Sequence, residues 1–193
     1  MRVFTVSGTP PTFSRSTGFE TAQLASPHVV DDLIRSRRTH KAYGPDPVPR
    51  ETLLELFELA RWAPNHHLTN PWRFRVIGPR ALETLKQAAE AHKPGSATKL
   101  DRAPTLVAVT AKQTGDAEQD HEDLLATAVA AYIVLLGAHA RGLAAYWRTV
   151  PVLGALGLPD DERPIGLLYL GTPRQEQRVP ERAPVEEIAF FLD

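Results

Sequence analysis

The run RSRRTHK, at residues 35–41, is the first stretch whose residue types could do chemistry. It combines four cations with the hydroxyl of Thr39, where a helical pattern ends and the chain turns. Guanidinium groups present planar donors that match phosphate oxygens, and a hydroxyl adds another hydrogen bond. The same cations would also stabilise the C-terminal end of a helix without any ligand. On these residues alone the structural interpretation is slightly favoured.

A second stretch, WAPNHHLTNPWRF at residues 62–74, places two adjacent histidines between two tryptophan–proline corners. A shared metal is disfavoured because neighbouring side chains diverge, the HExxH spacing is absent, and no cysteine completes a site. A hydrogen-bonding role in a site and a solvated loop both remain open, and the solvated loop is the default.

The third stretch, YWRTVP at residues 146–151, follows a β-like pattern and ends in an aromatic ring, a cation and a hydroxyl. Such a strand end offers a stacking surface and an anion partner, but a core tryptophan beside a surface arginine explains it equally well. The later YLGTP at residues 169–173 looks structural. The chain has no GxSxG, Walker or GxGxxG motif, which removes support for hydrolase and P-loop functions.

Periodicity predicts the elements that position these residues. The longest helix is apolar nearly all round, which is typical of the centre of a fold or of a subunit interface. Helices are expected at residues 26–38, 51–62, 79–92 and 120–142, strands at 72–77, 105–111, 143–147 and 165–171, and a helical turn near 152–157. The tail at 182–193 has an apolar face that needs a packing partner.

Composition limits the function classes. With 193 residues and 42% hydrophobic residues, the chain is long enough for one domain with a substantial core. Its net charge of -1 gives no global attraction to nucleic acid or anionic membranes. The apolar run at 124–138 is short for a membrane span, and the first 28 residues lack a signal-like apolar run. The absence of cysteine fits a reducing cytoplasm.

Taken in order, five segments resemble the nitroreductase family of FMN-dependent oxidoreductases, and its small bacterial subgroup most closely. They are RSRRTHKAYGPDPVP, LARWAPNHHLTNPWRFRVI, AVAAYIVLLGAHARGLAAYWRT, LLYLGTP and RAPVEEI. The resemblance implies an α+β fold with a central mixed sheet wrapped by helices, in an intertwined homodimer with FMN at the interface. It assigns residues 28–193 to the FMN-binding domain and leaves residues 1–27 as a loosely ordered arm.

The resemblance also implies which residues bind FMN. The opening segment, at residues 35–41, would hold the phosphate and ribityl chain, and a cation in it would face the pyrimidine side of the flavin. The loop that contains the two histidines, within residues 62–74, would reach the flavin of the other subunit. We call it the histidine loop. The strand end would line the flavin, and a tail arginine would reach the phosphate. These cofactor-binding residues are Arg37, Arg38, Thr39, Lys41, Trp62, Pro64, His66, Trp147, Arg148, Thr149 and Arg182.

The implied activity is an FMN-dependent NAD(P)H oxidoreductase that reduces nitroaromatics, quinones or similar acceptors by a ping-pong hydride mechanism. NADH or NADPH would be the donor, with no metal and no protein acid–base residue, because the flavin carries the chemistry. Two departures concern the substrate: YWRTVP replaces the Pro-x-x-Glu-Gly segment of larger members, and Asn70 replaces a glutamine. The alternatives are a non-catalytic flavin carrier or sensor and an interaction module with an empty site.

Overall fold

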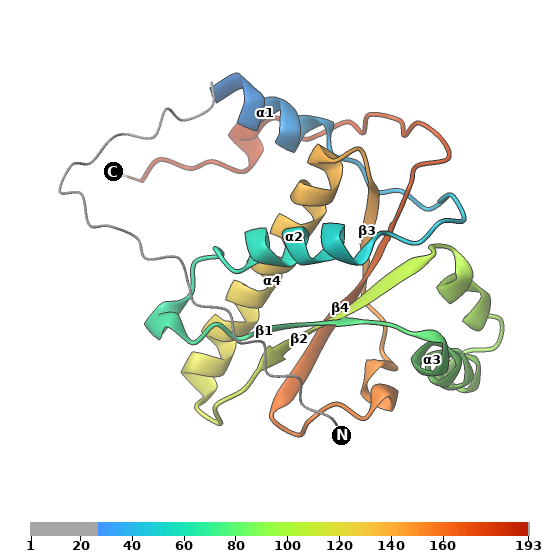
Figure 1. Cartoon of the computed structure of the whole chain (residues 1–193). Helices are drawn as coiled ribbons and strands as arrows, with labels where there is room; N and C mark the ends of the chain where they lie inside the picture. The colour runs from blue at the N-terminus through green and yellow to red at the C-terminus, as the bar shows by residue number, and fades with distance from the viewer. Residues whose placement is uncertain (1–26, 193) are drawn as a thin grey trace, which may run out of the picture.

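The computed structural model of the chain describes residues 27–192 (Figure 1). Except for Pro27, the arm expected at residues 1–27 lies outside the described residues. The four expected helices and four expected strands are present. The helices are α1 (Pro27–Ser36), α2 (Arg50–Ala60), α3 (Pro79–His92) and α4 (Ala117–Ala140), with short 3₁₀ turns η1 (His66–Leu68), η2 (Ala97–Asp101), η3 (Leu153–Leu156) and η4 (Val185–Glu187). The strands are β1 (Trp72–Val76), β2 (Thr105–Lys112), β3 (Ala144–Arg148) and β4 (Glu162–Gly171).

The strands form one sheet in the order β1-β2-β4-β3, so the α+β class is confirmed. The expectation of a mixed sheet was wrong, because every pair of neighbouring strands in this sheet is antiparallel. The chain leaves β1 and enters β2 at the same end of the sheet, where the Ile77 backbone N–H donates to the Leu106 carbonyl at 2.9 Å. The intervening α3 and η2 therefore form an excursion rather than a crossover. The parallel pairing in the described residues is an isolated bridge between Thr39 and Ala145.

Helices cover both faces of the sheet, and each face has its own core. Val107 and Val109 of β2 pack toward α2 and α4 on one face. Leu106 and Ala108 pack toward α3, η2 and η3 on the other. All four side chains are buried, which explains why the middle of β2 is apolar on both faces instead of alternating with polar residues.

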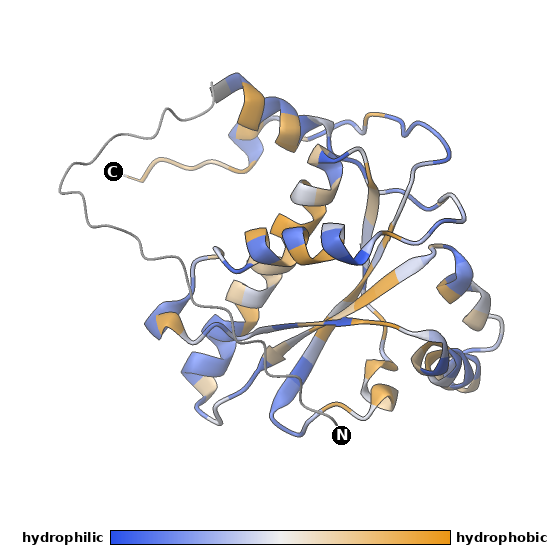
Figure 2. Cartoon of the chain, viewed as in Figure 1, coloured by the Kyte–Doolittle hydropathy of each residue, from blue (hydrophilic) through white to orange (hydrophobic). Residues whose placement is uncertain are grey.

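The central helix α4 packs across the sheet as the sequence predicted. Asp116 caps its N-terminus by accepting a hydrogen bond from the Gln119 backbone N–H at 2.9 Å. α4 is long enough for a membrane span, and an 18-residue window of it has a mean hydropathy of 1.7. Half of that window is, however, buried inside the fold. Figure 2 shows apolar residues along most of its length beyond the first turns. We therefore describe α4 as a core helix.

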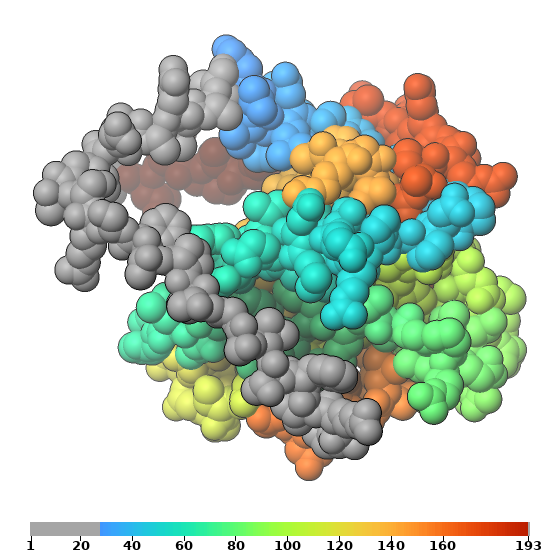
Figure 3. Space-filling model, viewed as in Figure 1, coloured from blue at the N-terminus to red at the C-terminus, as the bar shows by residue number. Residues whose placement is uncertain are grey.

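The described residues leave one side of α4 uncovered. Leu125, Val129 and Tyr132 are 55%, 40% and 37% exposed, and their spacing places them on one face of the helix. In this chain these three residues form the exposed stripe of α4. Figure 3 shows α2 lying across the front of the molecule with α1 above it. The tail beyond η4 is also uncovered, since Phe190 and Phe191 are 78% and 97% exposed.

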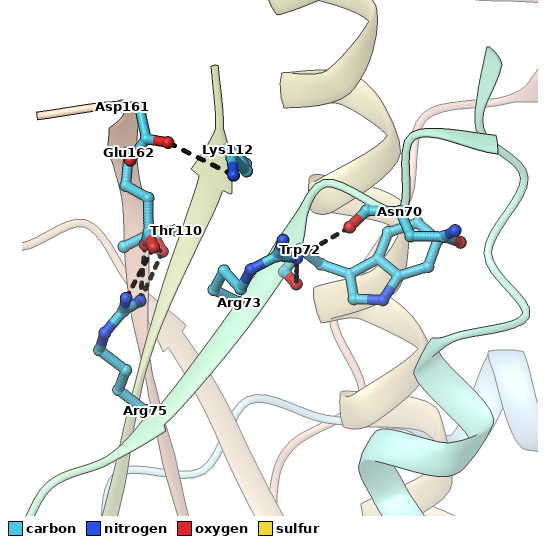
Figure 4. A network of polar contacts seen from close by, with 8 residues as sticks. All are labelled: Asn70, Trp72, Arg73, Arg75, Thr110, Lys112, Asp161 and Glu162. Atoms are coloured by element: carbon cyan, nitrogen blue, oxygen red, sulfur yellow. Dashed lines mark hydrogen bonds and ion pairs between the residues drawn. The ribbon is translucent and has the colours of Figure 1, made fainter. Parts of the chain in front are cut away.

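A polar network ties together three strands near one end of the sheet (Figure 4). Arg75 of β1 donates two hydrogen bonds to Glu162 of β4, both at 2.7 Å, and the Thr110 hydroxyl of β2 donates to the same carboxylate. Beside them, Lys112 and Asp161 form an ion pair at 3.4 Å. The Glu162 side chain is only 7% exposed. Burial alone would raise its pKa, but the hydrogen bonds from Arg75 and Thr110 and the nearby positive charge give a net lowering of the pKa.

Replacing Glu162 by glutamine is expected to reduce the free energy of unfolding by about 1–3 kcal/mol, because Arg75 would lose a charge partner while remaining only one-third exposed. A carboxyl whose folded pKa is lowered contributes stability above its unfolded pKa of about 4.3 and loses it as the pH falls toward the folded value. Urea unfolding between about pH 3 and pH 7 should therefore show a smaller loss of stability with acid in Glu162→Gln than in the parent. Equal pH slopes for the two proteins would contradict this role.

Candidate functional site

Four of the predicted residues lie together where α1 ends and the C-terminal segment returns. Arg37, Arg38 and Arg182 line two cavities of about 360 and 170 Å³, and Thr39 lines the smaller one. The C-terminal segment lies beside α1 in Figure 1 as well. In the part of the chain that the structure describes, no carboxylate lines either cavity. We call these four residues the arginine cluster, and its chemistry suits a phosphate group.

The geometry of the arginine cluster leaves donors available. Arg38 is held at the end of α1 because its Nη1 donates to the carbonyls of Arg35 and Arg37. The Nε of Arg37 is buried and has no hydrogen-bond partner among the described residues. Its guanidinium carbon lies 6.0 Å from the centre of the Tyr132 ring. A buried guanidinium N–H without a partner is costly, so an anion at this position would stabilise the site.

Two histidines lie beside the arginine cluster. The Nε2 of His139 in α4 lies 2.7 Å from the Ser36 hydroxyl, and the Nδ1 of His40 is buried without a partner in the described part of the chain. Burial, the neighbouring His139 and the charge of Arg37 lower the pKa of His40. Burial and the charges of Arg37 and Arg38 likewise lower the pKa of His139. Both imidazoles are therefore neutral near pH 7, and the arginines carry the positive charge.

Sequence reasoning missed two polar residues of this site. Gln177 and Arg178 line the smaller cavity together with Arg182. The available signal was the composition of RQEQRVPER at residues 174–182, where several donors accompany the predicted tail arginine. These two residues are far from α1 in sequence. They reach the same cavity as Arg37 and Arg38 only because the C-terminal segment returns to α1.

The histidine loop is fixed by its own backbone and by α4. The Asn65 Oδ1 accepts a hydrogen bond from the Asn70 backbone N–H at 2.9 Å, and His67 and Asn70 adopt left-handed conformations with φ of 52° and 47°. The His66 Nδ1 lies 2.6 Å from the Glu122 carboxylate. Pro64 and His66 line an open cavity of about 360 Å³ that continues onto the exposed stripe of α4. The loop is thus presented on the same surface as that stripe.

A buried carboxylate of α4 holds the histidine loop by a hydrogen bond. Asp123 is 1% exposed and accepts hydrogen bonds from the Thr69 hydroxyl at 2.6 Å and from the Gln119 amide at 3.0 Å. Both bonds reach the same oxygen, Oδ1. Asp123 therefore joins the loop to the helix, a connection that the sequence pattern did not reveal.

Replacing Asp123 by asparagine is expected to lower the free energy of unfolding by about 1–2 kcal/mol and to loosen the loop. An amide accepts more weakly than a carboxylate, and its NH₂ group would be buried with no acceptor assigned to it. Amide hydrogen exchange of residues 63–70 should accelerate roughly tenfold, which corresponds to about 1.4 kcal/mol. Asp101→Asn, which breaks an exposed ion pair with Lys86, is the matched control. Similar exchange in both variants would exclude the supporting role.

The predicted residues at the end of β3 point to different faces of the sheet. Trp147 packs toward the α2 and α4 face, where the absence of a side chain at Gly166 makes room for its ring. Arg148 points to the opposite face, and its Nη1 donates to the Tyr169 hydroxyl at 3.0 Å. Adjacent residues of a strand must alternate in this way. Thr149 and Lys41 line neither cavity of the arginine cluster.

The histidine loop and the arginine cluster lie far apart within one chain. The loop contacts α4 at Glu122, whereas α1 contacts it at His139. These positions are 17 residues apart on one helix, or roughly 25 Å along its axis. Trp62 at the start of the loop is 78% exposed, which is unusual for so large an apolar ring. One copy of the chain therefore assembles the arginine cluster but not the complete predicted set.

Comparison with known proteins shows the family to which the chain belongs. The sequence model of the Nitroreductase family matches residues 34–172, which include α2, all four strands and the first three residues of the arginine cluster. The chain belongs to the nitroreductase family. The described part of this nitroreductase holds no group of three or more histidine, aspartate or glutamate side chains suited to a metal ion.

Individual relatives agree with this assignment over most of the chain. YfhC of Bacillus subtilis (strain 168), provisionally named an NAD(P)H nitroreductase, is 27% identical over 187 residues, covering 87% of this chain and 96% of YfhC. A provisionally named nitroreductase of Desulfovibrio desulfuricans, solved in complex with FMN, has a TM-score of 0.72 and 26% identity, covering 88% of this chain and 98% of that one. A nitroreductase-like protein of Bacillus cereus has a TM-score of 0.76 at 23% identity, covering 85% and 96%, and shows the same fold.

Proposed function

We propose that this nitroreductase is an FMN-dependent NAD(P)H oxidoreductase of the cytoplasm that reduces nitroaromatics, quinones or similar electron-poor acceptors by a ping-pong mechanism. When bound, FMN supplies the hydride chemistry, so the protein needs no acid–base residue of its own. The observation that carries the proposal is the arginine cluster with its buried, unpartnered Arg37 Nε. The FMN complex of the Desulfovibrio relative supports the choice of cofactor.

The residues present fit the FMN phosphate. Arg37, Arg38 and Arg182 would hold its oxygens from two sides, and the Thr39 hydroxyl would add a donor. The phosphate would provide the acceptor that the Arg37 Nε lacks and would neutralise charges that no carboxylate of the cavities balances. Arg178, which lines the smaller cavity, would join this group.

We propose that the rest of the site is completed by a second copy of the chain in a homodimer. A two-fold axis near Val129, at the middle of the exposed stripe, would set the first half of one α4 against the second half of the other. The histidine loop of one copy would then approach the arginine cluster of the other, which removes the separation of roughly 25 Å within one chain. The exposed stripe, Trp62 and the apolar tail would be buried at the same time.

In this arrangement the flavin ring would lie between the two copies. Trp62, Pro64 and His66 would contact it from one copy. The end of β3 would line it from the other copy through Trp147, Thr149 and the backbone of Arg148, since the Arg148 side chain lies on the opposite face of the sheet. Lys41 would place a cation beside the pyrimidine side, where positive charge stabilises the anionic reduced ring. Residues 28–193 would form this flavin-binding domain.

Titration of flavin-free protein with FMN, followed by steady-state kinetics, tests the proposal. We expect one FMN per chain and parallel double-reciprocal lines when NADH or NADPH and a quinone or nitroaromatic are varied together, as a ping-pong order requires. Intersecting lines would contradict the ping-pong order. Stoichiometric FMN without turnover would favour the alternative, a flavin carrier or sensor. Protein that takes up no FMN would overturn both functions.

A further inference from the structure

A second cationic cavity lies on the opposite face of the sheet from α4. It has a volume of about 210 Å³ and lies between the end of α3, η2 and the segment that joins β3 to η3. In Figure 1 these elements meet beside the end of α3, away from α1 and the C-terminal segment. Its walls combine apolar side chains, among them Leu100 and Val150, with the cations Lys93, Lys99 and Arg148. We call it the α3 cavity.

The cations of the α3 cavity come from three different elements. Lys93 follows the last residue of α3, Lys99 lies in η2, and Arg148 is the last residue of β3. Lys93 can be explained by the favourable effect of a cation at the C-terminus of a helix. That effect does not explain Arg148, which reaches the cavity from the sheet. Like charges that converge from separate elements repel one another, so their positions favour a bound anion.

The nearby acids are engaged elsewhere. Asp101 pairs with the Lys86 ammonium at 3.0 Å, and Glu90 accepts hydrogen bonds from the backbone N–H groups of Gly95 at 2.8 Å and Ala97 at 3.4 Å. No carboxylate of residues 27–192 lines the α3 cavity. Among residues 27–192, Lys93 and Lys99 form no ion pair. The positive charge of the cavity is therefore not balanced by the carboxylates around it.

Arg148 gives the cavity an ordered donor. The Arg148 Nη1 donates a hydrogen bond to the Tyr169 hydroxyl at 3.0 Å, which fixes the guanidinium against the sheet. The other N–H groups of the guanidinium make no hydrogen bond among the described residues. A planar guanidinium with free donors matches a carboxylate, which accepts two parallel hydrogen bonds.

Volume and lining define the ligand further. A cavity of about 150 Å³ is enough to hold benzene, so the α3 cavity has room for one ring and a small polar group. Leu100, Val150 and Val152 supply apolar contact for the ring. We propose that the α3 cavity binds a small aromatic carboxylate, with the ring against the apolar wall and the carboxylate toward Arg148 and the two lysines. This site is additional to the arginine cluster.

Benzoate is the probe for this site, and isothermal titration of the flavin-loaded protein is the measurement. We expect one benzoate per chain, with inorganic phosphate and benzyl alcohol each binding at least about tenfold more weakly, because one lacks the ring and the other the charge. The Lys93→Gln/Lys99→Gln double variant should bind benzoate at least about tenfold more weakly. Lys112→Gln, which removes an exposed lysine near Asp161, should bind like the parent.

Arg148 is left intact because the proposed function also assigns it to the flavin. The flavin absorbance of each variant is recorded alongside, so the two proposals can fail separately. Absent benzoate binding, or equal binding by the parent and the double variant, with normal flavin content would overturn the α3 cavity proposal alone. Phosphate binding as tight as benzoate binding would overturn the aromatic carboxylate class. Benzoate binding by a protein that takes up no FMN would overturn only the proposed function.

Discussion

Replacing Arg38 by alanine is expected to weaken FMN binding about 10- to 100-fold, because a charge-assisted hydrogen bond to phosphate contributes about 1.5–3 kcal/mol. Arg38 is held at the end of α1 by two backbone carbonyls, so its position does not depend on the ligand. It also lines both cavities of the arginine cluster. Quenching of FMN fluorescence during titration into flavin-free protein measures the change in Kd directly.

Arg80→Ala is the matched control for this experiment. Arg80 is exposed near the start of α3, away from the arginine cluster. We expect the Arg80 variant to bind FMN like the parent, and a far-ultraviolet spectrum should show both variants folded. Unchanged FMN affinity in Arg38→Ala would exclude Arg38 from the phosphate site. Equal losses in both variants would indicate a general electrostatic effect instead.

Replacing Val129 by aspartate is expected to weaken dimerisation roughly 100-fold or more, because a carboxylate would be buried without a partner at the centre of the proposed interface. The two-fold symmetry applies the change twice. Since the histidine loop of one copy is proposed to complete the site of the other, FMN affinity should fall with the fraction of dimer. Sedimentation velocity and FMN titration at several protein concentrations measure both quantities.

Val76→Asp controls for the introduction of a charge. Val76 is 51% exposed on β1, compared with 40% for Val129, and lies away from the exposed stripe of α4. We expect the Val76 variant to remain dimeric and to bind FMN normally. A Val129 variant that stays dimeric would remove the exposed stripe from the interface. A monomeric variant that binds FMN as tightly as the parent would show that one chain suffices for the site.

Local chemistry made much of the fold predictable. α3 begins and ends where the sequence predicted, because Pro79 fits the first helical position and the apolar residues keep helical spacing up to His92. β2 was recognisable from its short β-branched run, which fits a strand whose two faces are both buried. The prediction of a mixed sheet was wrong because strand direction depends on where α3 returns the chain, and no local pattern records that return.

The candidate site was only partly predictable for a similar reason. The resemblance to the family assigned Arg37, Arg38 and Thr39, which are neighbours in sequence, whereas the residue types alone slightly favoured a structural role. Arg178 joins them only through the return of the C-terminal segment, and Asp123 supports the histidine loop from a helix more than 50 residues later. These are long-range contacts. The apolar tail has no covering partner within the described chain, which agrees with the proposal that a second copy covers it.

The proposed enzyme must hold a flavin that a nicotinamide donor reduces. The visible absorbance spectrum of the purified protein, recorded before and after NADH or NADPH is added separately without oxygen, tests this requirement most directly. We expect a yellow protein whose flavin bands bleach with at least one donor. Flavin bands that persist with both donors would contradict the enzyme function and favour a carrier. A colourless protein that also takes up no added FMN would contradict the account of the site, while the nitroreductase fold would stand.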